Sequence, residues 1–243
     1  MLQYASTLGI AHERNAIACG DVHSQLKTIF KGPWIKPCPT NVKFIHVVER
    51  GFGLYDENLV TNGAPSISVG TYLQSWKYFK NINDDIRRIF AFKDKFSPDS
   101  WISEHRKNSS TLVAVHLRFG RFNVAHSYIR LPPQGWYTKI YQRFNTKTTI
   151  VVFSDDLEKA MAYLPNPPSH INLIRSPNIS PAHDMALMSV CDEILSSRGT
   201  FSWWPIWLKG HGISYINEFD HTNPIVTNKI KNDDYYLPDT LII

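Results

Sequence analysis

The chain has 243 residues, of which 43% are hydrophobic and 19% charged, so it can bury a core and is not intrinsically disordered. The formal net charge of +5 favours acidic partners such as phosphates, but the scattered lysines and arginines form no basic stripe, which argues against nucleic-acid binding. No apolar run approaches the roughly 18 residues of a membrane-spanning helix, and no signal-peptide pattern opens the sequence.

The first half of the chain has less regular helix and strand patterns than the second. It ends in the polar segment "EHRKNSS", which predicts a domain boundary near residue 109, between domains over 1–109 and 110–243. Cys19, Cys38 and Cys191 are widely spaced, so we expect at most one disulfide and one remaining thiol, and no CxxC metal site. Asn108 and Asn178 begin sequons that would accept glycan in a secretory lumen, although such triplets also arise by chance.

Strand and helix patterns alternate along the second half. The runs at 111–119 ("TLVAVHLRF"), 148–153, 170–176 and 192–197 predict strands, and the segments near 156 and over 181–191 predict helices. Asp155 and Glu158 have the spacing of a capping box for the first of these helices. This order predicts a doubly wound, parallel α/β sheet, in which ligands bind at the carboxyl ends of the strands.

Two polar side chains lie at the end of the first predicted strand. His116 and Arg118 are two residues apart, so both point to one face of the sheet, whereas Phe119 points with Leu117 to the other. An arginine and a histidine there are suited to grip a diphosphate, because the guanidinium offers a fixed fork of donors to phosphate oxygens. The alternative is an ion pair that holds two elements together.

Polar residues also follow the second strand and open a later helix. Ser154 and Asp155 come at the second strand end, and Asp184 falls in the first turn of the helix after 181. Each has a purely structural interpretation, as a helix cap or as a complement to the helix dipole.

The stretch "SSRGTFSWWPIWLKG" joins the fourth strand to an apolar helix. Ser197 ends the strand, Gly199 permits a positive φ, and Pro205 favours a helix cap at Ser202 over one at Thr200. The hydroxyls and free N–H groups of such a helix start are suited to bind an anion. We interpret Trp203, Trp204 and Trp207 as core packing rather than as a platform for a sugar.

Five segments together resemble successive blocks of the galactoside α-1,2-fucosyltransferases, glycosyltransferase family 11. They are "MLQYASTLGIA", "VGTYLQSWKYFKNINDDIRRIF", "VAVHLRFG", "VVFSDDLEKAMAYL" and "HDMALMSVCDEILSSRGTFSWWPIWL", and they occur in family order over almost the whole chain. The resemblance implies a GT-B-like fold of two Rossmann-like halves with mostly parallel sheets, with the acceptor side in 1–109 and the donor side in 110–243. It also implies inverting transfer of L-fucose from GDP-fucose to a galactose-terminated glycan, with no metal and no other cofactor.

The resemblance extends to individual positions. It implies that Arg118 holds the donor diphosphate and stabilises the leaving group, and it assigns no catalytic base. The donor-binding residues that it implies are His116, Arg118, Ser154, Asp155, Asp184, Ser197, Thr200, Phe201 and Ser202.

The sequence departs from the family pattern at two positions. Phe119 and Arg121 stand where family members usually have a second arginine and an acidic residue. These departures keep open an alternative, in which a catalytically inactive relative binds glycan or nucleotide sugar without transferring it. The family further implies the lumenal side of the Golgi membrane. Because the sequence begins inside the family's first block, we expect contact with the membrane only through an anchor outside this sequence.

Overall fold

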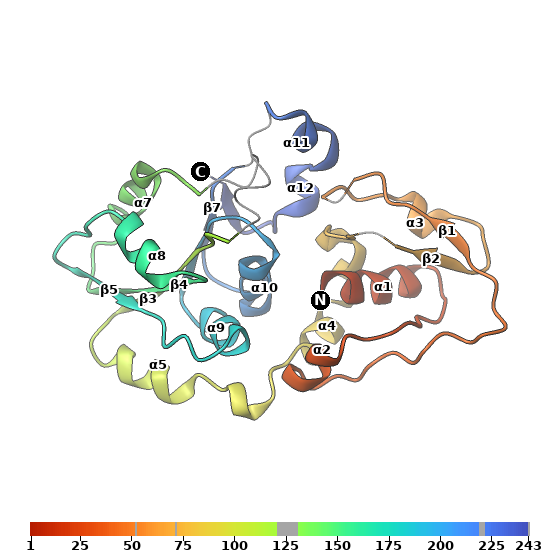
Figure 1. Cartoon of the computed structure of the whole chain (residues 1–243), viewed down its shortest axis with the longest axis horizontal. Helices are drawn as coiled ribbons and strands as arrows, with labels where there is room; N and C mark the ends of the chain where they lie inside the picture. Colours follow the sequence, from red (N-terminus) through yellow and green to blue (C-terminus); the bar gives the residue numbers. More distant parts are fainter. Residues whose placement is uncertain (52, 71, 121–130, 219–221, 243) are drawn as a thin grey trace. The chain divides into compact units, whose positions relative to one another are not determined.

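The computed structural model describes residues 1–51, 53–70, 72–120, 131–218 and 222–242. The chain forms two compact units: unit 1 comprises Met1–Lys93 and His221–Pro238, and unit 2 comprises Asp94–Asp220 and Asp239–Ile243 (Figure 1). Within the described ranges, no helix has the length and apolar character needed to cross a membrane.

Unit 1 consists of short helices around a small parallel sheet. Its strands β1 (Ile45–Val47) and β2 (Ile67–Val69) pair in parallel. Its helices are α1 (Leu2–Glu13), α2 (Ser24–Ile29), α3 (Asn58–Thr61), the 3-10 helix η1 (Trp76–Ile82), α4 (Asn83–Ile89), α11 (Pro224–Lys229) and α12 (Asn232–Tyr235). The last two join this unit through long-range contacts: the Gly53 N–H donates to the Lys229 carbonyl of α11 at 2.9 Å, and Lys77 of η1 forms an ion pair with Asp234 of α12 at 2.6 Å. Contacts between residues so far apart in the chain cannot be inferred from local spacing.

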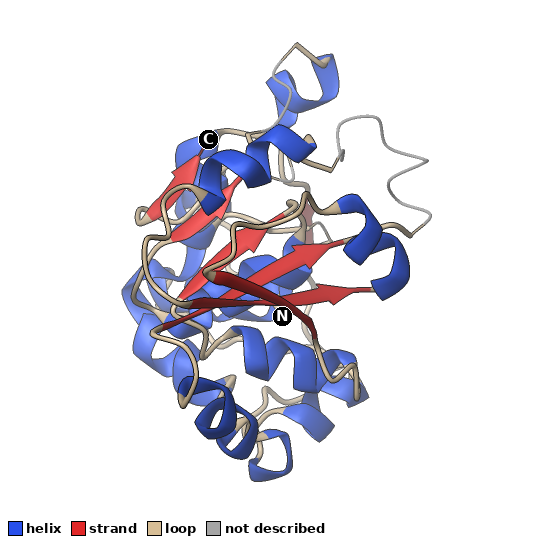
Figure 2. Ribbon diagram, turned by 90° about the vertical axis from the view of Figure 1, so that its left-hand side faces the viewer, coloured by secondary structure: helices blue, strands red, loops and turns tan. Residues whose placement is uncertain are grey.

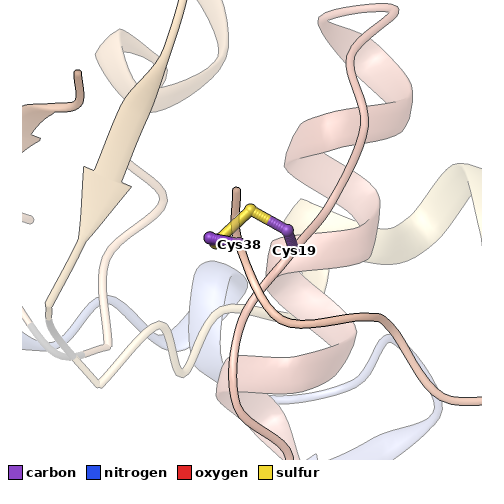
Figure 3. Close-up of a disulfide and its surroundings, with 2 residues drawn as sticks. All are labelled: Cys19 and Cys38. Atoms are coloured by element: carbon purple, nitrogen blue, oxygen red, sulfur yellow. A yellow bond between two sulfur atoms is a disulfide. The ribbon is translucent and has the colours of Figure 1, made fainter. Parts of the chain in front are cut away.

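The one disulfide among the described residues lies in unit 1. Cys19 is bonded to Cys38 (Figure 3), and Cys191 is a buried free thiol. The expectation of at most one bridge, with one remaining thiol, is therefore confirmed.

Unit 2 is built on a six-stranded, wholly parallel sheet with the strand order β5-β4-β3-β6-β7-β8. The strands are β3 (Thr111–Leu117), β4 (Thr148–Ser154), β5 (Ile171–Arg175), β6 (Glu193–Ser196), β7 (Ser214–Ile216) and β8 (Thr240–Ile242). The helices are the 3-10 helix η2 (Asp94–Phe96), α5 (Asp99–Arg106), α7 (Gln134–Tyr141), α8 (Leu157–Tyr163), α9 (Pro181–Met188) and α10 (Thr200–Lys209). Figure 2 looks onto this unit, with strands in red and helices in blue.

Helices cover both faces of the unit 2 sheet. Val115 and Leu117 of β3 pack in one core cluster with side chains of α7 and α8. His116, between them, points to the other face, where its ring lies 5.2 Å from the ring of Phe201 on α10. Strands covered on both faces are apolar at almost every position, which explains why β3 and β4 are mostly apolar and buried along their length.

The predicted strands and helices of the second half are confirmed in kind and order. The predicted boundary near residue 109 differs from the division between Lys93 and Asp94. Helix α5 precedes residue 109 but belongs to unit 2, because Arg106 at its end forms an ion pair with Asp192 at 2.8 Å. The acceptor and donor roles of 1–109 and 110–243 stay predictions.

Candidate functional site

The strand order of unit 2 reverses between β3 and β6. From β3 the chain adds β4 and β5 on one side, and it then returns to add β6, β7 and β8 on the other. In sheets of this type, ligands bind outside the carboxyl ends of the strands at such a reversal. His116 pairs in register with both Phe153 of β4 and Ser196 of β6, so the predicted residues of these three strands reach one edge of the sheet together.

His116 is a buried, neutral histidine at this edge. Burial, and then the charge of Arg118, lower its pKa from 6.5 to about 4, and the charge of Asp155 acts in the opposite direction. Among the described residues, no group forms a hydrogen bond with its Nδ1. An unpaired buried nitrogen costs free energy, which a bound ligand would offset by supplying a hydrogen bond.

The low pKa of His116 makes stability depend on pH. The folded-state pKa lies below the unfolded value, so the unfolded chain takes up the proton first as the pH falls below 6.5. We expect this residue to contribute stability that is complete above pH 6.5 and is lost towards pH 4, by up to about 3 kcal/mol. Urea unfolding of wild type and His116→Gln at about pH 7.5 and about pH 4.5 measures this loss.

The comparison with His116→Gln is needed because Asp184 changes the pH dependence of stability in the opposite direction. Burial raises the pKa of Asp184 from 3.8 to about 6, so the folded chain takes up its proton first and gains stability as the pH falls through that range. Subtracting the variant from wild type cancels this contribution. An equal loss of unfolding free energy in both proteins would contradict the assignment to His116.

Phe119 lies on the same face of the sheet as Leu117, as predicted, and the predicted direction of Arg118 stays a prediction. Arg118 is exposed, while Phe119 packs against the core cluster of α7 and α8, with its ring 6.1 Å from that of Tyr163. The side chain at position 119 therefore points away from the face that carries His116. Arg121, the second departure from the family pattern, lies outside the described residues.

Asp155 does not cap the following helix, so that interpretation was wrong. Helix α8 is capped by Asp156, which accepts a hydrogen bond from the Lys159 N–H at 3.1 Å. The two oxygens of Asp155 instead accept from the backbone N–H groups of Phe119 at 2.7 Å and Gly120 at 2.9 Å. This long-range contact could not be inferred from a local spacing. Ser154 is buried, and its Oγ accepts from the Asp156 N–H at 3.0 Å.

Helix α10 begins at Thr200, so the predicted cap at Ser202 was also wrong. Gly199 is the N-cap residue, with φ of 106°, and this left-handed conformation turns the chain into the helix earlier than Pro205 suggested. Ser202 instead links the helix to β6, because its Oγ lies 2.6 Å from the Oγ of Ser196. No described side chain caps this helix, so its first N–H groups are left for solvent or a ligand.

Other predicted residues surround this helix start. Ser197 is buried, and its Oγ has no hydrogen-bond partner among the described residues. Phe201 contacts the ring of His116. The interpretation of the tryptophans as core is borne out: Trp203, Trp204 and Trp207 are buried, and the ring of Trp204 meets each of the other two edge-to-face.

Asp184 lies beyond the end of β5. It is buried in the first turn of α9, with Ser176 and His183 as the neighbours that act on its pKa. Its Oδ1 has no hydrogen-bond partner among the described residues. The structure thus gives Asp184 the environment of a buried carboxyl group that can donate or accept a hydrogen bond, and its part in donor binding stays a prediction.

Two further features lie outside this edge. In unit 1, a groove of about 870 Å³ lies between α1 and β2 and is lined mainly by apolar side chains, with no predicted donor residue among them. The described ranges contain no group of three histidine, cysteine or acidic side chains placed to hold a metal ion. The absence of a metal requirement stays a prediction. Asn108 and Asn178 are both exposed.

Comparison with known proteins identifies the family. The family model described as glycosyl transferase family 11 matches residues 64–241. The chain belongs to this family.

The curated relatives are fucosyltransferases. Galactoside 2-alpha-L-fucosyltransferase Sec1 of Mus musculus is 24% identical over 186 residues, which cover 69% of this chain and 49% of that protein. Galactoside alpha-(1,2)-fucosyltransferase 2 of Oryctolagus cuniculus is 25% identical in an alignment 266 positions long that covers 98% of this chain and 72% of that protein. The match thus spans about half the length of the first relative and more of the second.

A solved structure supports the fold. Fucosyltransferase NodZ from Bradyrhizobium aligns with a TM-score of 0.51 and 11% identity, over 86% of this chain and 87% of that chain. At this identity the likeness concerns the fold alone. Together with the parallel sheet of unit 2, it confirms the predicted GT-B-like α/β class.

Proposed function

We propose that this member of glycosyltransferase family 11 transfers L-fucose from GDP-fucose to a hydroxyl of a galactose-terminated glycan. The proposed product is an α-1,2 linkage formed with inversion and without a metal ion. The observation that carries the proposal is the convergence of His116, Arg118 and the uncapped start of α10 at the reversal of the sheet. Family membership supports the reaction class.

The charges at this edge suit a diphosphate leaving group. Negative charge accumulates on GDP as its bond to fucose breaks, and fixed donors already aimed at that position stabilise it. Arg118 supplies a charged fork, and the first N–H groups of α10 supply the positive end of a helix dipole. Neutral His116, with its unpaired Nδ1, is suited to a hydrogen bond with the nucleotide.

Phe119 bears on the alternative of a binding protein without transferase activity. Its side chain packs on the face of the sheet opposite His116, against Tyr163. Phenylalanine at this position therefore takes no cation away from the face that carries His116. This geometry favours the transferase over the inactive relative.

Label transfer tests the proposal. The purified chain is incubated with GDP-fucose labelled in the sugar and a panel of galactosides, and transfer and donor hydrolysis are followed separately. We expect label in the glycan, released by an α-1,2-specific fucosidase. Binding of GDP-fucose without transfer to any acceptor would instead select the inactive relative.

We further propose that the protein works on the lumenal side of the Golgi membrane. The disulfide between Cys19 and Cys38 and the two exposed sequons are consistent with an oxidising, glycosylating compartment.

Asn108 is expected to carry N-linked glycan when the chain is produced in a secretory host. It follows α5 at the surface, so a glycan there meets no packed side chain. Glycosidase treatment should increase the gel mobility of wild type, and should do so less for Asn108→Gln. Asn178→Gln serves as the matched control for the second exposed sequon. Equal mobility shifts in wild type and Asn108→Gln would contradict the prediction.

A further inference from the structure

The turn that follows Arg118 is attached to the neighbouring strand by one carboxylate. Asp155, directly after β4, accepts hydrogen bonds from the N–H groups of Phe119 at 2.7 Å and Gly120 at 2.9 Å, one on each oxygen. Hydrogen bonds to a charged acceptor are roughly twice as strong as those between neutral groups. Asp155 thus fixes the two residues that come immediately after Arg118.

The absence of a side chain at Gly120 leaves room for this contact. A Cβ at position 120 would lie 2.7 Å from Oδ2 of Asp155, which is closer than real side chains approach. On the other side of the turn, the ring of Phe119 packs against Tyr163. The segment 118–120 is therefore held both by a partly buried ring contact and by the carboxylate.

The charges of Arg118 and Asp155 both act at this edge of the sheet. They influence the nearby His116 in opposite directions, which places both groups within electrostatic range of it. An anion beside Arg118 would be repelled by a carboxylate that faced it. Both Asp155 oxygens instead accept hydrogen bonds from backbone N–H groups of the 118–120 turn, so the carboxylate is directed at the turn.

We propose that Asp155 is a positioning residue for Arg118. It holds the 118–120 turn so that the guanidinium is preorganised for the diphosphate, and it does not itself contact the base or the sugar of the donor. The inference rests on the proposed function, because that function supplies the diphosphate. It assigns to Asp155 a role different from direct donor binding.

Nucleotide binding by Asp155→Asn separates the two roles. Asparagine has the same shape but offers one oxygen and no charge, so we expect GDP affinity in calorimetric titration to fall about tenfold. Affinity for guanosine, measured by ligand-observed NMR, should stay unchanged, because guanosine has no phosphate for Arg118 to hold. Loss of guanosine affinity would show that Asp155 contacts the nucleoside and would overturn the proposal.

Asp156→Asn is the matched control. It makes the same chemical change one residue later, at the cap of α8, where asparagine also caps well. We expect GDP affinity close to that of wild type. If this variant loses as much GDP affinity as Asp155→Asn, the effect comes from charge or from α8, and the proposal fails.

Gly120→Ala tests the contact between the turn and Asp155 without changing Asp155 itself. The added Cβ should displace the carboxylate and reproduce the selective loss of GDP affinity over guanosine affinity, with thermal melts confirming that the variant is folded. A folded variant with unchanged GDP affinity would contradict the positioning role.

A double-mutant cycle with Arg118→Ala completes the test. If Asp155 acts through Arg118, Asp155→Asn should weaken GDP binding about tenfold in wild type and less than about twofold in the Arg118→Ala background. Additive losses would overturn the inference while leaving the proposed function intact. Absence of GDP binding by wild type would instead overturn the proposed function, and the inference with it.

Discussion

Replacement of Arg118 with alanine is expected to lower the rate of fucosyl transfer by about 30-fold to 1,000-fold, equivalent to about 2 to 4 kcal/mol of transition-state stabilisation. The guanidinium stands at the carboxyl end of β3, beside the reversal of the strand order. Arg118→Lys should recover only part of the rate, because lysine keeps the charge but not the planar fork. Initial rates with saturating acceptor and varied GDP-fucose provide the measurement.

Arg175→Ala is the matched control for this experiment. Arg175 is the last residue of β5 and forms an exposed ion pair with Glu158 at 2.7 Å, so it also places a guanidinium at a strand end but away from the reversal. We expect the rate of fucosyl transfer by Arg175→Ala to stay close to that of wild type. Similar rates for Arg118→Ala and wild type would remove Arg118 from the donor site.

Replacement of Trp203 with alanine is expected to destabilise the protein by about 3 to 5 kcal/mol. Only 2% of Trp203 is exposed, and its ring meets that of Trp204 edge-to-face at 5.2 Å, so the substitution leaves a cavity beneath α10. Chemical denaturation followed by circular dichroism measures the loss. Acceptor affinity should be unaffected in the fraction that remains folded.

Trp101→Ala provides the comparison for this loss. Trp101 is half-buried on α5 and stacks on His105 with the ring centres 3.7 Å apart, so less apolar surface becomes exposed and we expect a smaller change in unfolding free energy. A Trp203→Ala variant with wild-type stability and weakened glycan binding would contradict the interpretation as core and would support a sugar platform.

The parallel sheet could be predicted because its strands are covered on both faces. Such strands are apolar at almost every position, so β3 and β4 stand out as unbroken runs, and polar residues mark where they end. The same logic predicts from the sequence that His116, Arg118 and Ser197 lie at one edge of the sheet. Side-chain alternation also predicts Phe119 on the opposite face, where it packs.

Long-range contacts account for what the sequence did not predict. The caps assigned to Asp155 and Ser202 followed local spacing, but Asp155 bonds to a turn 35 residues away, at Gly120. Ser202 lies inside the helix, whose N-cap is Gly199, and its hydroxyl forms a hydrogen bond with that of Ser196 on β6. Likewise, the return of 221–238 to unit 1 is held by contacts between residues far apart in the sequence, such as the backbone bond between Gly53 and Lys229 and the ion pair between Lys77 and Asp234.

Hydrogen–deuterium exchange with and without GDP most directly tests the central claim, that the donor binds where β3 and β6 end. We predict that GDP slows amide exchange in peptides covering His116–Gly120 and Ser196–Ser202, because these segments hold the diphosphate. Peptides from the apolar groove of unit 1, such as Asn62–Val69, should exchange at the same rate in both states. Protection of the groove peptides without protection at the ends of β3 and β6 would contradict this account of the donor site.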